Sequence, residues 1–325
     1  MGQIKKQNPV ARVLGIREVP LLLFITAAVI ALAIAEPRFM LFGNIHSILL
    51  GGSYESIIAI GMTLLFVMGG FDLSVGSVAG FAGVILKLCF KAEIDIWLSI
   101  AIALSLSAAI GLVNGLIISY LKVNSLITTL SMQMIVRGLI YVFTKGIATA
   151  DFPQQFTILG RATFLNIQVP IYICLVLAVI FSMQYKKSAW FRQFYFIGGG
   201  EEAARLSGIK VDQLKVFAYV FTAILAGLAG VLLGARMGGA IPTQGEGIEM
   251  NIIAGCVIGG CSVNGGEGSV FGSVMGVMLM ALILNAFNLV GIDIYWQKAI
   301  KGSILLFAVL MDILRQRRIL NRQFA

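Results

Sequence analysis

Long apolar runs, separated by short polar connections, follow one another along nearly the whole chain. Several of these runs exceed the roughly 18 residues that a helix needs to cross the hydrocarbon core of a membrane. The pattern predicts an all-α fold, a polytopic integral membrane helical bundle of about ten transmembrane helices that forms a single domain over residues 1–325. The expected spans cover residues 20–35, 47–68, 75–90, 97–118, 124–143, 168–184, 213–235, 248–262, 269–289 and 297–314.

The most conspicuous polar interruption covers residues 190–210 and reads WFRQFYFIGGGEEAARLSGIK. Its centre, Glu201–Leu206, consists of good helix formers, and glycines lie on both sides of it, Gly198–Gly200 before and Gly208 after. The sequence therefore predicts a short helix bracketed by glycines. A helix of this kind, held at the surface of a membrane protein, has a shape that fits a groove on a partner. The alternative is an ordinary basic loop.

The composition is typical of a membrane protein and not of a soluble one. Of the 325 residues, 59% are hydrophobic and 12% are charged, whereas soluble globular domains carry about a quarter charged residues. The four cysteines all lie in apolar runs and form no CxxC pair, so we expect neither disulfides nor a metal site. The net charge of +9 would suit a nucleic acid, but its distribution along the chain indicates membrane topology instead.

The lysines and arginines are unevenly divided between alternate ends of the expected spans. With the N-terminus inside, the cytoplasmic side holds about twice as many of them as the outer side, as the positive-inside rule requires. The sequence therefore predicts an N-in, C-in topology. Its cytoplasmic parts are an N-terminal segment over residues 1–19, a loop over residues 185–212 and a basic tail over residues 315–325. The first apolar run lacks a small-residue cleavage site, so we expect a retained first span.

The chain shows no pattern that indicates catalysis. It contains no GxxxxGKS/T phosphate-binding loop, which excludes ATP hydrolysis by that route. His46 is the only histidine, and it lies at the edge of the second expected span. We see no nucleophile–base pair and no cluster of metal ligands in the sequence. We therefore expect a protein that is not an enzyme and that has no catalytic or metal-binding residues.

A second polar interruption, GGFDLSVGS, covers residues 69–77. The Asp72 carboxylate can accept hydrogen bonds from the free amides of a helix that begins at Leu73. Two placements are open: a turn at the cytoplasmic end of two spans, or a break within the membrane of the kind that lines transport pathways. The stretch GGEGSVFG at residues 265–272 repeats the glycines and the GSV of this segment, which indicates a weak internal repeat.

Two charged residues, Glu55 and Arg137, lie inside expected spans, where insertion scales give a cost of about 3 kcal/mol for a charge. Arg137 belongs to a polar stripe with four-residue spacing, which lies on one face of a helix. The members of the stripe are Thr129, Gln133, Arg137 and Tyr141. Such a face must contact protein or water. It forms either a hydrogen-bonded seam that fixes helix register, or part of a transport route beside which Glu55 and Arg137 form an ion pair.

Two further stretches place polar residues near expected spans. The first, PTQGEGIEMNIIAGCVIGG, covers residues 242–260, and its glycines permit a sharp external turn before Glu249. Glu249 is a candidate for an external gate, for a contact with a partner protein, or for an ordinary interfacial acid. The second, LNAFNLVG, contains Asn285 and Asn288, which are three residues apart and share a helix face. Their amides can either bridge helices or bind ligand hydroxyls.

These stretches resemble, in the same order, motifs of the permease subunits of bacterial ABC importers of the ribose/xylose/arabinose type. GGGEEAARLSGI resembles the coupling loop of that family, and VRG at residues 136–138 resembles an LRG-like setting in the fifth span. GGFDLSVGS, PTQGEGIEMNIIAGCVIGG and LNAFNLVG resemble three other motifs. The family usually has asparagine, an aliphatic residue, aspartate and an uncharged amide at positions where this chain has Gly200, Phe71, Asn251 and Glu55.

The resemblance, which covers most of the chain from Met62 to Asp312, implies roles for particular residues. The coupling loop would dock on a separate ATPase, and Glu249 would form an external gate or touch a binding protein. The residues implied in ATPase coupling are Gly200, Glu201, Glu202, Ala203, Ala204, Arg205, Leu206, Ser207 and Gly208. The residues implied along the substrate pathway are Glu55, Asp72, Ser74, Gln133, Arg137, Asn285 and Asn288.

As a member of this family, the chain would be the multi-pass permease subunit of an ATP-driven importer in the bacterial cytoplasmic (inner) membrane. It would move a monosaccharide, such as a ribose-like pentose, by alternating access. The implied partners are an ABC ATPase, a periplasmic or lipid-tethered sugar-binding protein, a second permease subunit (in a homodimer or paralogous heterodimer) and membrane lipid, but no nucleic acid. This chain would bind no cofactor, since ATP and Mg belong to the ATPase. The alternative is a secondary, ion-coupled sugar transporter, which would need intramembrane acids such as Glu55.

Overall fold

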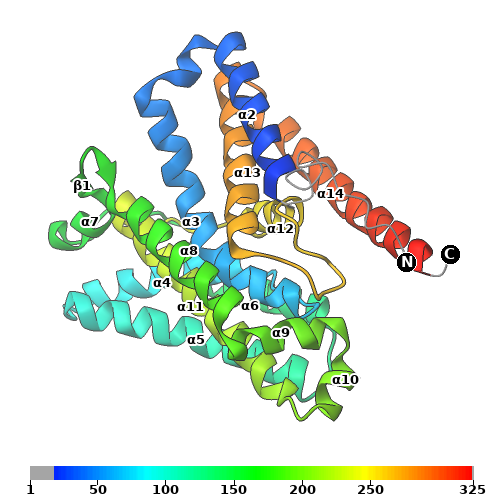
Figure 1. Cartoon of the computed structure of the whole chain (residues 1–325). Coiled ribbons are helices and arrows are strands. Elements are labelled where there is room, and N and C mark those ends of the chain that lie inside the picture. Colours follow the sequence, from blue (N-terminus) through cyan, green and yellow to red (C-terminus); the bar gives the residue numbers. More distant parts are fainter. Residues whose placement is uncertain (1–17, 324–325) are drawn as a thin grey trace.

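The computed structural model describes residues 18–323, which form helices joined by short connections and one small hairpin (Figure 1). The helices are α2 (Glu18–Ala35), the 3-10 helix η1 (Pro37–Met40), α3 (Phe42–Val67), α4 (Val75–Lys91), α5 (Ile96–Ser119), α6 (Ser125–Thr144), α7 (Gln154–Arg161), α8 (Val169–Lys187), α9 (Ala189–Gly199), α10 (Glu201–Leu206), α11 (Val211–Met237), α12 (Ile248–Ile258), α13 (Val270–Val290) and α14 (Ile294–Gln323). The strands β1 (Thr163–Phe164) and β2 (Ile167–Gln168) pair antiparallel. The all-α character is confirmed.

Each expected span overlaps one of these helices. Within the described residues, six helices are long and apolar enough to cross a membrane, namely α3, α5, α6, α8, α11 and α13. The apolar part of α2, Leu21–Ala35, and all of α12 are shorter. The helices therefore fit a polytopic membrane protein, while the number of ten spans and the N-in, C-in topology stay predictions.

The expectation that residues 248–262 form a full span is wrong. α12 has 11 residues, so at 1.5 Å per residue it is about 16 Å long, about half of the hydrocarbon thickness. It follows Gly245 and Gly247, whose φ angles of 76° and 79° favour glycine. It ends before Gly259–Gly260, where the chain turns. The apolar run continues past this turn, which is why hydropathy alone made the helix too long.

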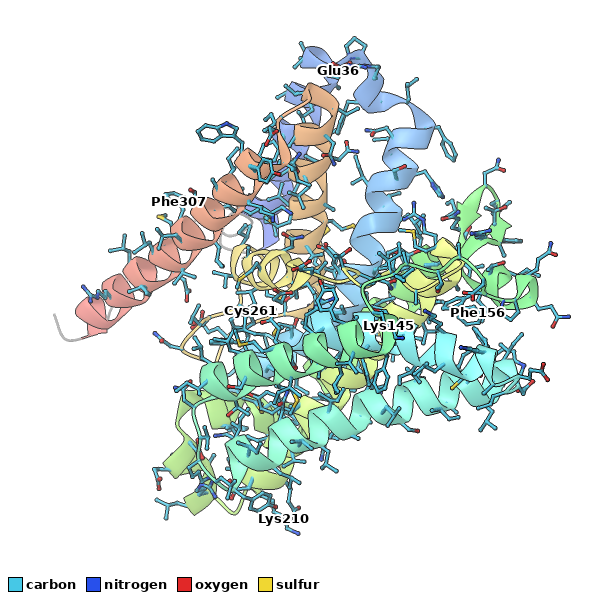
Figure 2. The ribbon with its side chains drawn as sticks, turned by 180° about the vertical axis from the view of Figure 1, so that it is seen from behind. Glu36, Lys145, Phe156, Lys210, Cys261 and Phe307 are labelled. Atoms are coloured by element: carbon cyan, nitrogen blue, oxygen red, sulfur yellow. The ribbon has the colours of Figure 1, made fainter. Side chains whose placement is uncertain are left out.

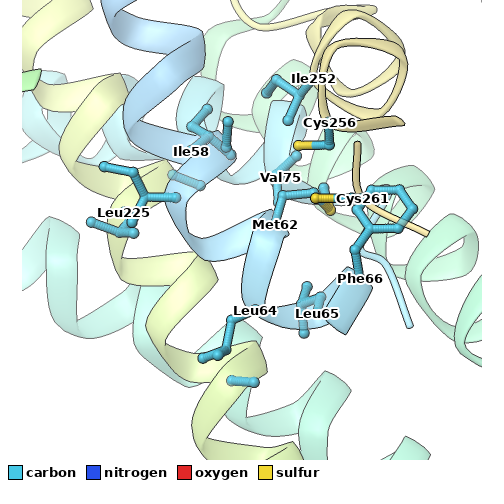
Figure 3. Close-up of a cluster of buried hydrophobic side chains, with 14 of the residues drawn as sticks. Ile58, Met62, Leu64, Leu65, Phe66, Val75, Leu225, Ile252, Cys256 and Cys261 are labelled. Atoms are coloured by element: carbon cyan, nitrogen blue, oxygen red, sulfur yellow. The ribbon is translucent and has the colours of Figure 1, made fainter. Parts of the chain in front are cut away.

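The core of the molecule is built around α3, whose most apolar window is 83% buried. α3 packs against α8, α11, α12 and α13. Figure 3 shows part of the resulting cluster, in which Met62 of α3 lies among apolar side chains together with Cys256 and Cys261. All four cysteines of the chain are buried and form no disulfide. The thiols therefore serve as small apolar side chains in the core.

Glycines allow α5 to lie close to α11. A Cβ atom added to Gly111 would lie 2.9 Å from the Cα of Val220, and one added to Gly115 would lie 2.8 Å from the Cα of Val216. Real Cβ atoms do not approach a neighbouring backbone so closely, so larger residues at these positions would push the two helices apart. Small residues at four-residue spacing produce this kind of packing between membrane helices.

The two ends of the molecule carry different connections. Figure 2 shows the turn at Glu36 and the loop at Lys210 at opposite ends. α14 extends away from the bundle and contacts mainly α12, and Phe307 on α14 is 66% exposed. The expected N-terminal segment, residues 1–19, lies outside the described residues apart from its last two. The expected tail, residues 315–325, continues α14 as far as Gln323.

Candidate functional site

The interruption predicted to contain a short helix does contain one. α10 covers Glu201–Leu206, the same residues that the glycine spacing indicated, and only Gly200 separates it from α9. After α10 the chain turns at Gly208, whose φ of 81° favours glycine. The prediction of a short helix bracketed by glycines is confirmed. Its role in docking an ATPase stays a prediction.

α10 has an exposed face and a face directed at the rest of the chain. Leu206 is 89% exposed, and Glu202, Ala203 and Ser207 are exposed with it. On the other face, Ala204 is 3% exposed and belongs to the hydrophobic core. The exposed face, which carries Leu206 and Ala203 and is free of contacts with the described residues' core, is the candidate docking surface.

Glu201 and Arg205 lie on the inward face of α10 and form an ion-pair network with residues outside it. Arg205 donates to both carboxylate oxygens of Asp212 on α11, at 2.8 and 2.6 Å, and to Oε1 of Glu201 at 2.9 Å. Lys215 on α11 donates to Oε2 of Glu201 at 2.5 Å. Lys122, between α5 and α6, donates to Oδ1 of Asp212 at 2.7 Å. We call these five side chains the charge network.

The charge network fixes the ionised state of the α10 residues. Hydrogen bonds to Asp212 and Glu201 raise the pKa of Arg205 above its ordinary value. Partial burial acts to raise the pKa of Glu201, but the hydrogen bonds from Lys215 and Arg205 outweigh it and the pKa of Glu201 is lowered. Both side chains are therefore fully charged at neutral pH.

α9 anchors α10 to the long helices through aromatic packing. Phe194 on α9 is fully buried. Trp190 lies edge-on to Phe194 and to Phe217 of α11, with ring centroids 5.1 and 4.7 Å apart. Phe191 stacks on Tyr185 near the end of α8, with centroids 4.7 Å apart. Each such pair contributes about 0.5–1.5 kcal/mol, so α9 gives α10 a rigid support.

The segment between α3 and α4, residues 69–74, is held together by buried polar groups, and we call it the first break. Oδ1 of Asp72 accepts hydrogen bonds from the amide and the hydroxyl of Ser74, at 2.7 and 2.6 Å. Both residues are fully buried. The Asp72 carboxylate accepts a backbone amide, as expected. The expected helix start at Leu73 is wrong, since residues 73–74 form a turn and α4 begins at Val75.

Two neighbouring helices attach to the first break. Nδ2 of Asn114 on α5 donates to the Ser74 hydroxyl at 3.1 Å and to Oδ2 of Asp72 at 3.4 Å. The Tyr219 hydroxyl on α11 donates to the Phe71 carbonyl at 3.5 Å. The first break therefore depends on both α5 and α11 for its position.

The two segments that repeat the same glycine pattern meet in the structure. The amide of Gly266, between α12 and α13, donates to the Val67 carbonyl at the end of α3, at 2.9 Å. Gly198 at the end of α9 lies against the same two backbone groups, so that a Cβ atom there would clash with both. The Tyr195 hydroxyl donates to the Gly268 carbonyl at 2.9 Å. α9 is thereby joined to the segments that follow α3 and α12.

α6 holds the loop that leads into α12. Nη1 of Arg137 donates to the carbonyls of Pro242 and Gln244, at 2.9 and 3.0 Å. Nε2 of Gln133 donates to Oε1 of Glu249 at 3.0 Å. We call these contacts the α6 clamp, and they are the hydrogen-bonded seam that the polar stripe of α6 predicted as one alternative. Glu249 is only 4% exposed. Its roles as an external gate, a contact with a partner protein or an interfacial acid stay predictions.

The hypothesis of an ion pair between Glu55 and Arg137 is wrong. Oε1 of Glu55 accepts a hydrogen bond from Nδ2 of Asn251 at 3.1 Å, while Arg137 binds the loop carbonyls. The amide of Asn251 thus connects the short helix α12 to the core helix α3. Nη1 of Arg137 binds backbone oxygens, which offer partial negative charge without the burial of a second full charge.

The two asparagines of α13 have different partners. Asn285 and Asn44 of α3 exchange amide hydrogen bonds at 3.1 and 2.8 Å. Oδ1 of Asn288 accepts from Nε2 of Gln297 on α14 at 3.0 Å. Both residues bridge helices, as one of the two alternatives proposed for them requires. Contact with a ligand stays a prediction for each.

Sequence reasoning missed most partners in these contacts. The missed residues are Asn44, Asn114, Lys122, Asp212, Lys215, Tyr219 and Gln297. Asp212 offered a signal, because an acid seven residues after Arg205 in a basic loop invites pairing. The others come from distant parts of the chain, and nothing in their local spacing indicated the contact. Across residues 18–323, no group of three or more His, Cys, Asp or Glu side chains could hold a metal ion.

A bundle of long apolar helices with polar contacts buried between them, and with an exposed short helix on a charged support, has the features of a membrane transport subunit. The chain matches, over residues 44–309, the family described as the permease component of the branched-chain amino acid transport system. It belongs to this permease family.

The relatives of known name are permeases as well. The chain is 36% identical over 288 residues to the L-arabinose transport system permease protein AraH of Escherichia coli (strain K12), covering 89% of this chain and 88% of the relative. It is 35% identical over 287 residues to the ribose import permease protein RbsC of the same organism, covering 86% and 89%. For RbsC of Bacillus subtilis (strain 168) the identity is 36%, covering 87% and 89%. No solved structure matches the chain.

Proposed function

We propose that the chain is the transmembrane permease subunit of an ATP-driven importer, which moves a monosaccharide across the bacterial cytoplasmic membrane by alternating access. The observation that carries the proposal is α10, a short helix that exposes Leu206 and rests on a support of ion pairs and aromatic packing. The relatives that are named for L-arabinose and ribose support a pentose as the substrate, although the family description names branched-chain amino acids.

In this proposal ATP hydrolysis belongs to a separate ATPase subunit, which binds ATP and Mg and docks on the exposed face of α10. A periplasmic or lipid-tethered sugar-binding protein delivers the sugar at the opposite end. A second permease subunit, identical or paralogous, completes the route. Membrane lipid surrounds the long helices, and exposed apolar side chains such as Met134 and Val142 on α6, at 70% and 69% exposure, suit that environment.

We place the external gate at the α6 clamp. Opening the route there requires Gln133 to release Glu249 and Arg137 to release the loop carbonyls, which exposes polar groups to a sugar. Both amide atoms of Gln244 and Oε2 of Glu249 have no hydrogen-bond partner within the described residues although they are buried. Asp72, Ser74, Asn285 and Asn288 already bind other side chains, so in this proposal they support the helices along the route.

The competing function is an ion-coupled sugar carrier. The buried Oε2 of Glu55, which has no hydrogen-bond partner within the described residues, is the observation that favours it, because a buried acid can carry a proton. Such a carrier would transport sugar without an ATPase. The two functions therefore differ in what must be added to the purified chain.

The experiment reconstitutes the chain in liposomes with the ATPase and the sugar-binding protein encoded beside it. Uptake of radiolabelled ribose and of L-arabinose is measured with and without ATP. We expect uptake only with ATP and both partners. Sugar uptake by the chain alone, driven by an ion gradient, would refute the proposal.

The docking surface is tested with Leu206→Glu. We expect this variant to lose co-purification of the ATPase and ATP-driven uptake, because a charge replaces the exposed apolar contact. The matched control is Leu165→Glu. Leu165 is 76% exposed in the hairpin far from α10 (Figure 1), and its substitution should leave co-purification of the ATPase unchanged. Equal behaviour of the two variants would contradict the assignment of the docking surface to α10.

A further inference from the structure

The charge network connects α10 to other parts of the chain. Arg205 and Glu201 of α10 bind Asp212 and Lys215 of α11, and Lys122 binds Asp212. One pair, Arg205 with Glu201, lies within α10. Lys122 lies in the short connection between α5, which ends at Ser119, and α6, and Lys215 lies one turn into α11. The Lys215 side chain is only 16% exposed, so its bond to Glu201 is less screened by water than an ion pair at the surface. A displacement of α10 therefore pulls on α5 and on α11.

The same two helices hold the first break. α5 reaches it through Asn114, which donates to the Ser74 hydroxyl. α11 reaches it through Tyr219, which donates to the Phe71 carbonyl. Lys215 and Tyr219 are four residues apart on α11 and so share one face of that helix. The charge network at one end of this face and the first break at the other are thus joined by a single helical turn.

A pocket of about 250 Å³, partly open to the surface, lies between the two. Gly69 and Gly70 of the first break line one part of it, and Lys122, Glu201 and Lys215 of the charge network line another. Tyr219 also lines it. No side chain of the described residues fills this space, so it leaves room for the first break to shift when its attachments move.

We propose that the charge network is the mechanical connection between α10 and the first break, and that Lys215 and Lys122 act as positioning residues that transmit movement of α10 to residues 69–74. This proposal rests on the proposed function, since it needs an ATPase that moves α10. The exposed face of α10 binds the ATPase and the inward face passes the movement on. Docking and transmission are then separate properties of one short helix.

The test uses Lys215→Met, which keeps an apolar stem of similar length and removes the charge. Lys122→Met tests the second branch of the network, and Lys215→Arg is the conservative variant. The matched control is Lys210→Met, because Lys210 is exposed in the same loop and forms no ion pair with the described residues. Each variant is reconstituted with the ATPase and the binding protein. ATP hydrolysis, and uptake of ribose or L-arabinose, are measured in the same liposomes.

We expect Lys215→Met and Lys122→Met to bind the ATPase as wild type does and to hydrolyse ATP, while sugar uptake per ATP hydrolysed falls about tenfold. Lys215→Arg should restore most of the ratio, and Lys210→Met should stay within about twofold of wild type. Wild-type uptake per ATP in both methionine variants would overturn the proposal. So would loss of ATPase binding in them, because the network would then serve docking only. Failure of the proposed function looks different, since wild type itself would show no ATP-driven uptake.

Discussion

Replacing Arg137 by methionine tests whether the α6 clamp stabilises the fold as its geometry implies. Arg137 donates charged hydrogen bonds to two loop carbonyls, at 2.9 and 3.0 Å. Methionine fills similar space but leaves both carbonyls without this donor. A hydrogen bond to a charged group contributes about 1.5–3 kcal/mol, and a buried unsatisfied carbonyl is unfavourable by a similar amount. Removal of the partly buried charge offsets part of the loss.

We expect Arg137→Met to lower the free energy of unfolding by about 3 kcal/mol. Arg137→Lys, which can donate to a carbonyl as a single charged group, should recover about half of that. Arg161 provides a matched control, since it also donates to two carbonyls, those of Arg236 and Met237, at 2.8 and 3.2 Å. Arg161 is exposed, so water replaces its bonds and Arg161→Met should change the stability by about 0.5 kcal/mol.

The assay is unfolding of the purified variants in one detergent, followed by circular dichroism of the helices and compared with wild type. The order of stability should be wild type, Arg161→Met, Arg137→Lys, Arg137→Met. If Arg137→Met and Arg161→Met lower the free energy of unfolding equally, burial does not determine how much these arginine–carbonyl hydrogen bonds contribute to stability. The α6 clamp would then be no stronger than a surface contact, and the gate placed there would lose its physical basis.

Three other contacts can be tested separately. Gly198→Val should prevent folding, because the valine side chain would clash with the backbone of two segments. Gly199 has nothing within 4 Å of an added Cβ atom, so Gly199→Val should fold. Equal yields of monodisperse protein from the two variants would contradict this packing. A double-mutant cycle on Asn44 and Asn285 should give a coupling energy of about 1 kcal/mol in unfolding, and a value of zero would dismiss the bridge. The pKa of Glu201 is lowered on folding, so its stabilising contribution is complete at neutral pH and is lost as the pH falls below about 4.5. Protection of the α10 amides from hydrogen exchange, corrected for intrinsic rates, should follow that loss in wild type. It should depend less on pH in Glu201→Gln, where Asp212, whose pKa is also lowered, is the remaining carboxylate of the charge network.

The helices could be predicted because the membrane imposes a simple rule. A run of apolar residues must satisfy its backbone internally, and a helix is the local way to do so. α10 could be predicted because glycines mark both of its ends. The length of α12 could not be obtained in this way, since the apolar run continues through Gly259–Gly260. Glycines allow the chain to turn there, and the position of this turn depends on the packing of α12 against α3 and α13.

The contacts of the candidate site were harder to predict than the residues themselves. Glu55 and Arg137 were recognised as unusual because a charge in a span is costly, yet the expected pair does not form. An arginine has several donors and can bind any carbonyl that a loop brings within reach, and the sequence does not show where the loop before α12 lies. Lys122 and Lys215 looked like ordinary basic residues beside a membrane, and only the fold brings them to Glu201.

The burial of all four cysteines, among them Cys256 and Cys261 in the core, has a practical consequence for spectroscopy. The wild-type chain offers no accessible thiol to a maleimide or nitroxide reagent in its folded state. A single cysteine introduced at an exposed position, such as Ser207 beside α10, would therefore carry the only reactive probe. Distances and accessibilities could then be measured without first removing native side chains from the core.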